Sequence, residues 1–152
     1  NLNKKIGAKK KKGKIRQQNI VGTTTYWKIE YDAVNPCEVE SEMEKLYSEI
    51  AMLLKEQLTF NEVCFFSSMI HRVFVKIHPW NDGNGRSARL LEKWFLAQKL
   101  GDKAWFVQSE KNYYQQHQTY YKNIRLLGLE YPELDYYQAL PFLLMLTDSV
   151  GV

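Results

Sequence analysis

The segment that most constrains the fold of this chain is the apolar stretch from Phe60 to Ile77. Thr59 precedes it, and Glu62 follows three residues later, which is the spacing of a capping box at a helix N-terminus. His78-Pro79 closes the stretch, because a proline disfavours helical geometry at the residue before it. A helix that is apolar on almost every side has to be buried. The sequence therefore predicts one central helix that the other elements must surround.

Two amphipathic helices are expected on either side of this central one. Asn35-Pro36 supplies an N-cap and a proline at the first helical position, and a second helix begins near Arg86 and stops at Gly101. Each carries an apolar stripe at helical spacing, so both should lie on the core. The positions that we expect to face inward are Val39, Met43, Leu46, Tyr47, Ile50, Leu53 and Leu54 in the first helix and Leu90, Leu91, Trp94, Phe95 and Leu100 in the second.

The C-terminal third predicts two more helices. One runs from Ser109, as N-cap, to Leu127, and the other starts at Asp135 and is bent by Pro141. Residues 20–31, rich in Thr, Tyr, Trp and Ile, are the one convincing β signal and favour a short hairpin. The expected fold class is all-α: a single compact helical domain with a short β-hairpin flap.

Composition and charge narrow the class of protein. The chain has 152 residues, of which 45% are hydrophobic and 25% charged, as is typical of one globular domain. Two cysteines without a C-x-x-C pair support neither a disulfide framework nor a zinc knuckle, so a cytoplasmic protein is expected. No apolar run is long enough to span a membrane.

Positive charge is concentrated at the N-terminus. The first 16 residues hold eight of the 21 basic residues and no acid, which leaves 13 basic against 17 acidic residues in the rest. We interpret residues 1–12 as a basic arm and residues 13–152 as the functional domain, with a nucleic-acid partner unlikely from this pattern alone. The stretch from Gly7 to Ile15 is no P-loop, because five residues separate its glycines and Ile15 replaces the Mg²⁺-binding hydroxyl.

The chemistry is concentrated in one string, His78-Pro79-Trp80-Asn81-Asp82-Gly83-Asn84-Gly85-Arg86-Ser87-Ala88-Arg89. Gly83 and Gly85 let backbone N–H groups approach an anion, and the positive end of the helix that follows points into the same loop. Arg86 and Arg89 share one helix face and can each pair with a phosphate. Asp82 is a hard oxygen ligand suited to Mg²⁺ on a nucleotide, and His78 is the natural general base.

Each of these residues, taken alone, also has an ordinary structural interpretation. Asp-Gly and Asn-Gly alone are common turns, and His78 alone would be a helix C-cap. The whole set between two helices is poorly explained as a turn. His71 is interpreted as a packed helix residue rather than a metal ligand. The tyrosine-rich face of residues 113–121 is interpreted as core, with Tyr120 and Tyr121 as the alternative candidates for a nucleotide-base pocket.

The string resembles the signature of the Fic family, H-x-F-x-D/E-G-N-G-R-x-x-R, and departs from it only at Trp80. Typical members transfer AMP from ATP to a hydroxyl side chain of a target protein. Gly13-x-x-Arg16 is similar to the family's G-x-x-R element, and the resemblance covers roughly residues 13–128. The docking flap of the family falls on residues 20–31, with the target-facing positions at Thr24, Thr25, Tyr26, Trp27 and Lys28.

The resemblance implies a role for each motif residue. His78 would deprotonate the target hydroxyl, and Asp82 would hold Mg²⁺ against the α- and β-phosphates. Gly83, Asn84 and Gly85 would form the anion hole. In this reading the Asn84 amide contacts the α-phosphate, Arg86 the β-phosphate and Arg89 the γ-phosphate.

Two departures from the family pattern bear on regulation and reaction type. No glutamate in this chain is followed by Gly or Asn, so the family's inhibitory S/T-x-x-x-E-G/N helix is not found, and an inhibitory partner protein acting in trans is one alternative. Gly85 stands where kinase-like members carry Lys, which favours AMP transfer. Transfer of UMP or phosphate, removal of AMP, and a non-catalytic nucleic-acid- or protein-binding module remain the alternatives.

Overall fold

The computed structural model describes residues 15–19, 21–23, 29–128 and 131–150. Within these ranges the chain is mainly helical, as predicted. The elements are β1 (Val21–Thr23), β2 (Ile29–Asp32), α1 (Val39–Lys55), α2 (Phe60–Ile77), α3 (Asn84–Leu100), η2 (Gly101–Phe106), α4 (Ser109–Gln115), α5 (His117–Arg125), η3 (Tyr131–Glu133), η4 (Tyr136–Ala139) and α6 (Leu140–Thr147).

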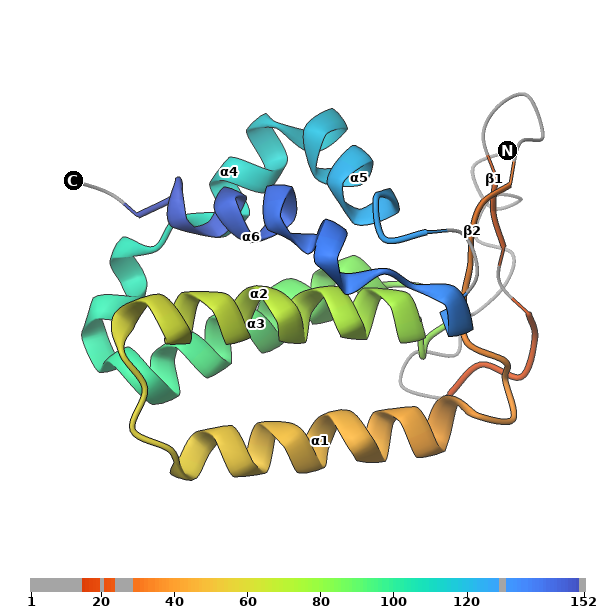
Figure 1. The fold of residues 1–152 in the computed structure, drawn as a ribbon, viewed down its shortest axis with the longest axis horizontal. Helices are drawn as coiled ribbons and strands as arrows, with labels where there is room; N and C mark the ends of the chain where they lie inside the picture. The colour runs from red at the N-terminus through yellow and green to blue at the C-terminus, as the bar shows by residue number, and fades with distance from the viewer. Residues whose placement is uncertain (1–14, 20, 24–28, 129–130, 151–152) are drawn as a thin grey trace, which may run out of the picture.

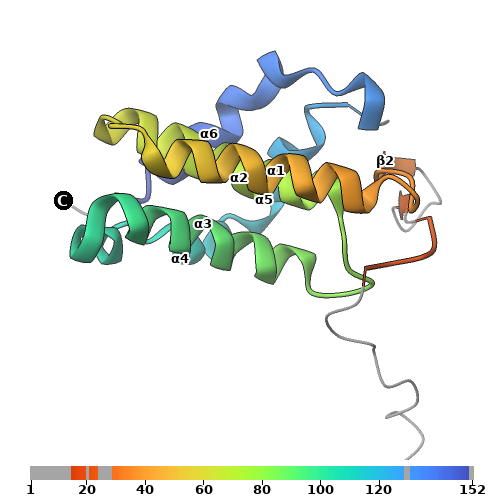
Figure 2. The ribbon, with the colours of Figure 1, turned by 90° about the horizontal axis from the view of Figure 1, so that it is seen from below.

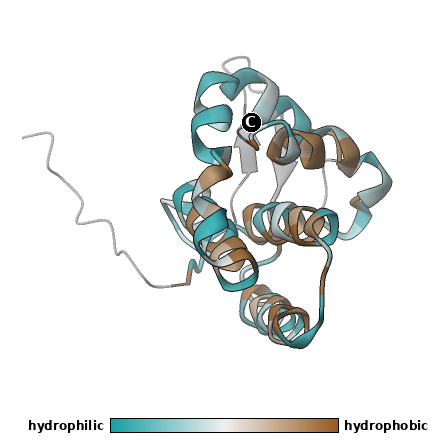
Figure 3. Cartoon of the chain, turned by 90° about the vertical axis from the view of Figure 1, so that its left-hand side faces the viewer, coloured by the Kyte–Doolittle hydropathy of each residue, from teal (hydrophilic) through white to brown (hydrophobic). Residues whose placement is uncertain are grey.

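Helices α2 and α3 form an antiparallel pair in the middle of the domain (Figures 1 and 2). Helix α1 lies on one side of this pair, and α4, α5 and α6 lie on the other. The antiparallel strands β1 and β2 make the predicted hairpin, which sits at the end of the domain where α2 passes into α3. Seen along the helices, hydrophobic positions turn toward one another and hydrophilic positions face outward (Figure 3).

The central helix begins and ends as its sequence predicts. The Thr59 hydroxyl accepts a hydrogen bond from the Glu62 N–H, and the Glu62 carboxylate accepts one from the Thr59 N–H at 2.7 Å. Burial follows the apolar pattern through Val63, Ile70 and Phe74. The predicted capping box is confirmed, and it sets where α2 starts.

The predicted helix from Ser109 to Leu127 is wrong as a single element. Gln116 has φ −109° and ψ 37° and divides it into α4 and α5. Ser109 is not the N-cap, because its hydroxyl instead donates to the Glu92 carboxylate at 2.5 Å. This tertiary contact with α3 thus overrides the local capping preference of Ser109.

The start of the last helix also differs from the prediction. Asp135 caps a short 3-10 turn by accepting a hydrogen bond from the Tyr137 N–H at 2.9 Å. Pro141 then stands in the first turn of α6 and begins that helix instead of bending it. The reason is that proline lacks only an N–H that the first turn leaves unpaired anyway.

The predicted inward face of α3 is partly wrong. Phe95 is fully buried, whereas Leu90 is 69% exposed and Trp94 41% exposed. These two residues, four apart on one face, line a groove between α3 and α1 that Tyr47 of α1 also lines. Helix α1 therefore leaves this part of the α3 stripe uncovered. No helix among the described residues is both long and apolar enough to cross a membrane.

We expect Phe95→Ala to lower the free energy of unfolding by about 3–5 kcal/mol, because it opens a cavity in the core. Leu90→Ala on the same helix should change it by less than about 1 kcal/mol, because an exposed side chain leaves no cavity. Urea unfolding of the two variants checks the difference. Equal losses of unfolding free energy would contradict the burial of Phe95 and the exposure of Leu90.

Candidate active site

The predicted motif residues all lie at one end of the α2–α3 pair. His78 is the C-cap of α2, Asp82 and Gly83 lie in the loop that follows, and α3 begins at Asn84. The motif therefore combines the carboxyl end of one buried helix with the amino end of the next.

The backbone of His78 is held in an unusual conformation. It is left-handed, with φ 54° and ψ 57°, and among the described residues it is the one non-glycine with a positive φ. Pro79 disfavours the ordinary helical conformation at the residue before it. Such a conformation costs on the order of 1–3 kcal/mol and persists only where the surroundings impose it. The residues around His78 must therefore hold its backbone in the left-handed conformation.

The contacts of the His78 ring indicate which of its two nitrogens carries the hydrogen. Nδ1 lies 3.3 Å from the Val75 carbonyl oxygen, which can only accept, so Nδ1 carries the hydrogen and Nε2 the lone pair. Burial lowers the pKa of His78, the hydrogen bond to Val75 raises it, and the charge of Arg16 lowers it again, for a net decrease. His78 is thus an uncharged imidazole at neutral pH, as a general base requires.

Arg16 is the side chain that fixes the end of α2. It is 1% exposed, and its guanidinium donates to the carbonyl oxygens of His78 at 2.7 Å, Ile77 at 3.3 Å and Val34. It also donates to Gln18 at 2.8 Å. One side chain therefore binds the helix C-terminus, the segment before α1 and its own segment.

The backbone around Arg16 binds the loop as well. The Arg16 N–H donates to the Pro79 carbonyl oxygen at 2.9 Å, and Ile15 pairs with Trp80 as an isolated antiparallel bridge. The sequence marked Arg16 only as part of G-x-x-R and did not show this role. A lone arginine between a polar segment and a hairpin has no local signal for burial.

Asn84 braces the loop from the other side. Its Oδ1 accepts from the Trp80 N–H at 2.9 Å, and its Nδ2 donates to the Trp80 carbonyl oxygen at 2.7 Å. The Trp80 ring packs near Phe74, with 6.5 Å between ring centroids, so it anchors the loop on α2. The second Nδ2 hydrogen is the one that the predicted contact with an α-phosphate would use.

The amino end of α3 has the form of an anion site. Gly83 is the N-cap of α3 and has φ 91°. The first hydrogen bond of the helix runs from the Ser87 N–H to the Gly83 carbonyl oxygen. The N–H groups before Ser87 therefore have no acceptor within α3. A Cβ on Gly83 would lie 3.4 Å from Arg86 Nη2, and a Cβ on Gly85 3.4 Å from Arg89 Nη1. Both arginine side chains therefore lie directly beside the backbone of the two glycines, and the positive φ at Gly83 is one that L side chains rarely adopt.

Asp82 and Arg86 lie together beside this helix end. The Arg86 guanidinium is 3.3 Å from the Asp82 carboxylate, and the two side chains are 66% and 39% exposed respectively. No cluster of three His, Cys, Asp or Glu suited to a metal occurs in the described part of the chain. One accessible carboxylate fits Mg²⁺, which is usually bound by one or two carboxylates together with substrate phosphates.

Arg89, one turn after Arg86 on α3, lines a cavity of about 300 Å³. Tyr113 and Tyr114 of α4 line this cavity, as do Tyr120 and Tyr121 of α5. Tyr120 is 4% exposed and Tyr121 52% exposed. The structure therefore places both predicted base-pocket residues beside a predicted phosphate arginine.

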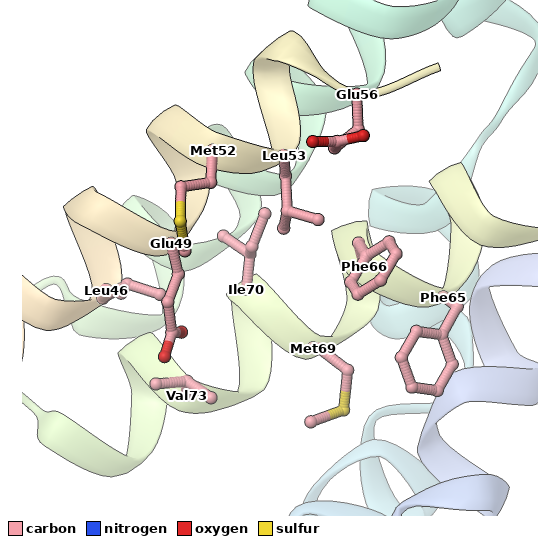
Figure 4. A pocket seen from close by; sticks show the side chains of 10 residues that line it. All are labelled: Leu46, Glu49, Met52, Leu53, Glu56, Phe65, Phe66, Met69, Ile70 and Val73. Atoms are coloured by element: carbon pink, nitrogen blue, oxygen red, sulfur yellow. The ribbon is translucent and has the colours of Figure 1, made fainter. Parts of the chain in front are cut away.

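Two further cavities in the described part of the chain lack this chemistry. A groove between α1 and α2 is lined by apolar side chains with Glu49 and Glu56 among them (Figure 4). The groove between α1 and α3 is likewise mostly apolar. Neither contains an arginine of the motif. The Arg89 cavity is the one of the three that combines motif charge with aromatic walls.

The flap positions Thr24, Thr25, Tyr26, Trp27 and Lys28 lie outside the described residues, as do Gly13 and the basic arm. Their predicted roles stay predictions. Strands β1 and β2 are described on either side of residues 24–28, with the register Val21 to Asp32 and Gly22 to Tyr31. The hairpin is thus in the place expected for the flap.

A helical domain with a histidine and an anion-binding helix end on one loop has the architecture of a Fic-type transferase. The sequence model of the Fic/DOC family matches residues 1–96, more than half of the chain, and the chain belongs to this family. Members of the family transfer nucleotide or phosphate groups to proteins. Comparison with curated protein sequences yields no significant match.

A solved structure with the same fold is that of a Fic domain containing signaling protein from Bacteroides thetaiotaomicron. The TM-score is 0.66 at 22% sequence identity, over 91% of this chain and 51% of that one. This likeness shows the fold. The present chain spans about half the length of that protein.

We expect Arg16→Met to lower the free energy of unfolding by about 3 kcal/mol or more, because it leaves several buried carbonyl groups without a donor. It should also change the NMR chemical shifts of the His78 ring. Lys122→Met, which removes an exposed cation from α5, should change stability by less than about 0.5 kcal/mol. Urea unfolding and histidine NMR spectra test this, and a stable Arg16→Met variant with an unchanged His78 signal would contradict it.

Proposed function

We propose that this chain is a protein adenylyltransferase. It transfers AMP from ATP to a Tyr, Thr or Ser hydroxyl of a target protein and releases pyrophosphate. The observation that carries the proposal is the pairing of a neutral His78, with its lone pair on Nε2, with an anion-binding helix end on the same loop. A base and a phosphate site on the same loop suit attack of a hydroxyl on a phosphorus atom.

The nucleotide is bound mainly through its phosphates. Backbone N–H groups at Gly83, Asn84 and Gly85 receive the α-phosphate, Arg86 the β-phosphate and Arg89 the γ-phosphate. Asp82 would hold Mg²⁺, which supplies positive charge to the α- and β-phosphate oxygens when bound. Arg86 can exchange its contact with Asp82 for the phosphate, since both groups are solvent-accessible. Such preorganised charge stabilises phosphoryl-type transition states.

The chemical step is a balanced displacement. The target hydroxyl oxygen bonds to the α-phosphorus as the bond from that atom to the pyrophosphate oxygen breaks. The hydroxyl proton passes to Nε2 of His78, while Nδ1–H keeps its bond to the Val75 carbonyl oxygen. The fixed tautomer ensures that the lone pair is on the nitrogen that has to accept the proton.

The base of the nucleotide would lie in the Arg89 cavity against Tyr120 and Tyr121. Aromatic walls suit stacking on a purine or pyrimidine without selecting between them. The lack of a side chain at Gly85, directly beside Arg89, favours the nucleotide orientation needed for AMP transfer over transfer of phosphate.

The target and a regulator are the proposed macromolecular partners. The hairpin would bind a target segment by adding a strand to its edge, which uses main-chain hydrogen bonds. An inhibitory partner protein in trans would act by placing a carboxylate on Arg89. That contact would exclude the γ-phosphate.

His78→Ala should reduce transfer by about 10²–10⁴-fold, because it removes the base, while ATP affinity stays nearly unchanged. Incubation with ATP labelled at the α-phosphate, Mg²⁺ and a cell lysate measures transfer, and equilibrium titration measures affinity. Labelling at the wild-type rate by His78→Ala would exclude this mechanism. Absence of labelling by the wild type would favour the binding-module alternative.

Arg86→Ala should weaken ATP binding by about tenfold or more, because it removes a charge-assisted contact. Deletion of residues 1–12 should change it by less than about threefold, because the proposed phosphate contacts come from the loop and from the start of α3. Titration of both variants at two salt concentrations compares them. The reverse order would move the phosphate site to the arm and favour a nucleic-acid-binding role.

A further inference from the structure

A buried polar network lies behind the Arg89 cavity. It consists of His71 of α2, Glu92 of α3, Ser109 and Tyr113 of α4, and Tyr120 of α5, each at most 4% exposed. Its members come from helices that are distant in sequence. The proposed transfer step uses none of their polar groups.

Glu92 is the acceptor at the centre of this network. Its carboxylate receives hydrogen bonds from Ser109 at 2.5 Å, Tyr113 at 3.0 Å and His71 Nδ1 at 2.7 Å. Three hydrogen-bond partners on one buried carboxylate hold it in one position. Glu92 is therefore the fixed end of the network.

The network continues from Glu92 through His71. A carboxylate oxygen accepts, so the His71 ring donates to it through Nδ1. The other ring nitrogen, Nε2, lies 2.9 Å from the Tyr120 hydroxyl, so the ring joins Glu92 to Tyr120.

The network reaches the cavity that Arg89 lines. The Tyr120 oxygen can accept a hydrogen bond, and a guanidinium can only donate. Tyr120 and Arg89 line the same cavity. Burial raises the pKa of Tyr120, and the charge of Arg89 acts in the opposite direction. The network thus extends from Glu92 through His71 and Tyr120 to the cavity wall that Tyr120 shares with Arg89.

We propose that His71 and Glu92 are positioning residues that act through Tyr120 to hold the Arg89 guanidinium at the γ-phosphate site. They thereby determine the preference of the protein for a nucleoside triphosphate over a monophosphate. The inference rests on the proposed function, in which Arg89 binds the γ-phosphate. His71, expected from sequence to be a packed helix residue, is packed and also carries this hydrogen-bond relay.

The test compares the affinities for ATP and AMP at fixed Mg²⁺ concentration. Tyr120→Phe removes one hydroxyl and keeps the ring, so it should weaken ATP binding about fivefold to tenfold and AMP binding less than about twofold. Glu92→Gln should shift the ATP-to-AMP ratio in the same direction. Asn123→Ala is the matched control: it removes a buried polar group of α5 that donates to the Pro141 carbonyl oxygen and should leave the ratio unchanged.

A double-mutant cycle separates positioning from a merely structural role. In the Arg89→Ala background, Tyr120→Phe should have no further effect on the ATP-to-AMP ratio, because the group that it positions is gone. Equal weakening of ATP and AMP by Tyr120→Phe would overturn the inference, as would an unchanged ratio.

The failures of the two proposals are distinguishable. If Arg89→Ala abolishes the preference for ATP while Tyr120→Phe and Glu92→Gln retain it, the inference is wrong and the proposed phosphate site stands. If Arg89→Ala itself leaves the ratio unchanged, the γ-phosphate assignment fails, and the inference fails with it.

Discussion

The candidate site depends on the buried guanidinium of Arg16. The carbonyl groups at the C-terminal end of α2 carry partial negative charge, so a cation there is stabilised by the helix dipole as well as by its hydrogen bonds. By binding Ile77 and His78 together with Val34, this side chain joins the end of α2 to the segment that leads into α1. The left-handed conformation of His78 is thereby held against its intrinsic cost, and the same positive charge contributes to the low pKa of the ring.

A second set of buried basic residues fixes the C-terminal elements on α2. Arg72 donates to the carbonyl oxygens of Ala139 and Asn123, and Lys76 donates to that of Gly128. Burial lowers the pKa of Arg72 to about 10 and that of Lys76 to about 8. Removing the partner of a buried charge is costly. These contacts therefore favour one docking position of α5 and α6, which is also the position that brings the tyrosines of α4 and α5 up to Arg89.

The parts of the fold that could be predicted are those encoded within one or two turns. The capping box of Thr59, the glycine stop at Gly101 and the long apolar periodicity of α1 and α2 are local, and the structure has them. The motif predicted which residues surround the loop, because its spacing alone puts them on adjoining helix ends. The break at Gln116 had no local signal, since no glycine or proline stands between Ser109 and Leu127. Leu90 and Trp94 were misplaced because periodicity shows that a stripe exists, not how much of it a neighbour covers.

The sequence by itself determined the all-α class, the family and the candidate base, because spacing along the chain is enough to specify capping, periodicity and a contiguous motif. Only the tertiary structure decided how the site is held. Arg16 meets His78 across 62 residues, and His71 meets Glu92 across 21 and Tyr120 across 49. Contacts at such separations arise from helix packing, which no local pattern contains. The physical reason is that a buried polar side chain needs a partner, and only the packed fold determines which partner is within reach.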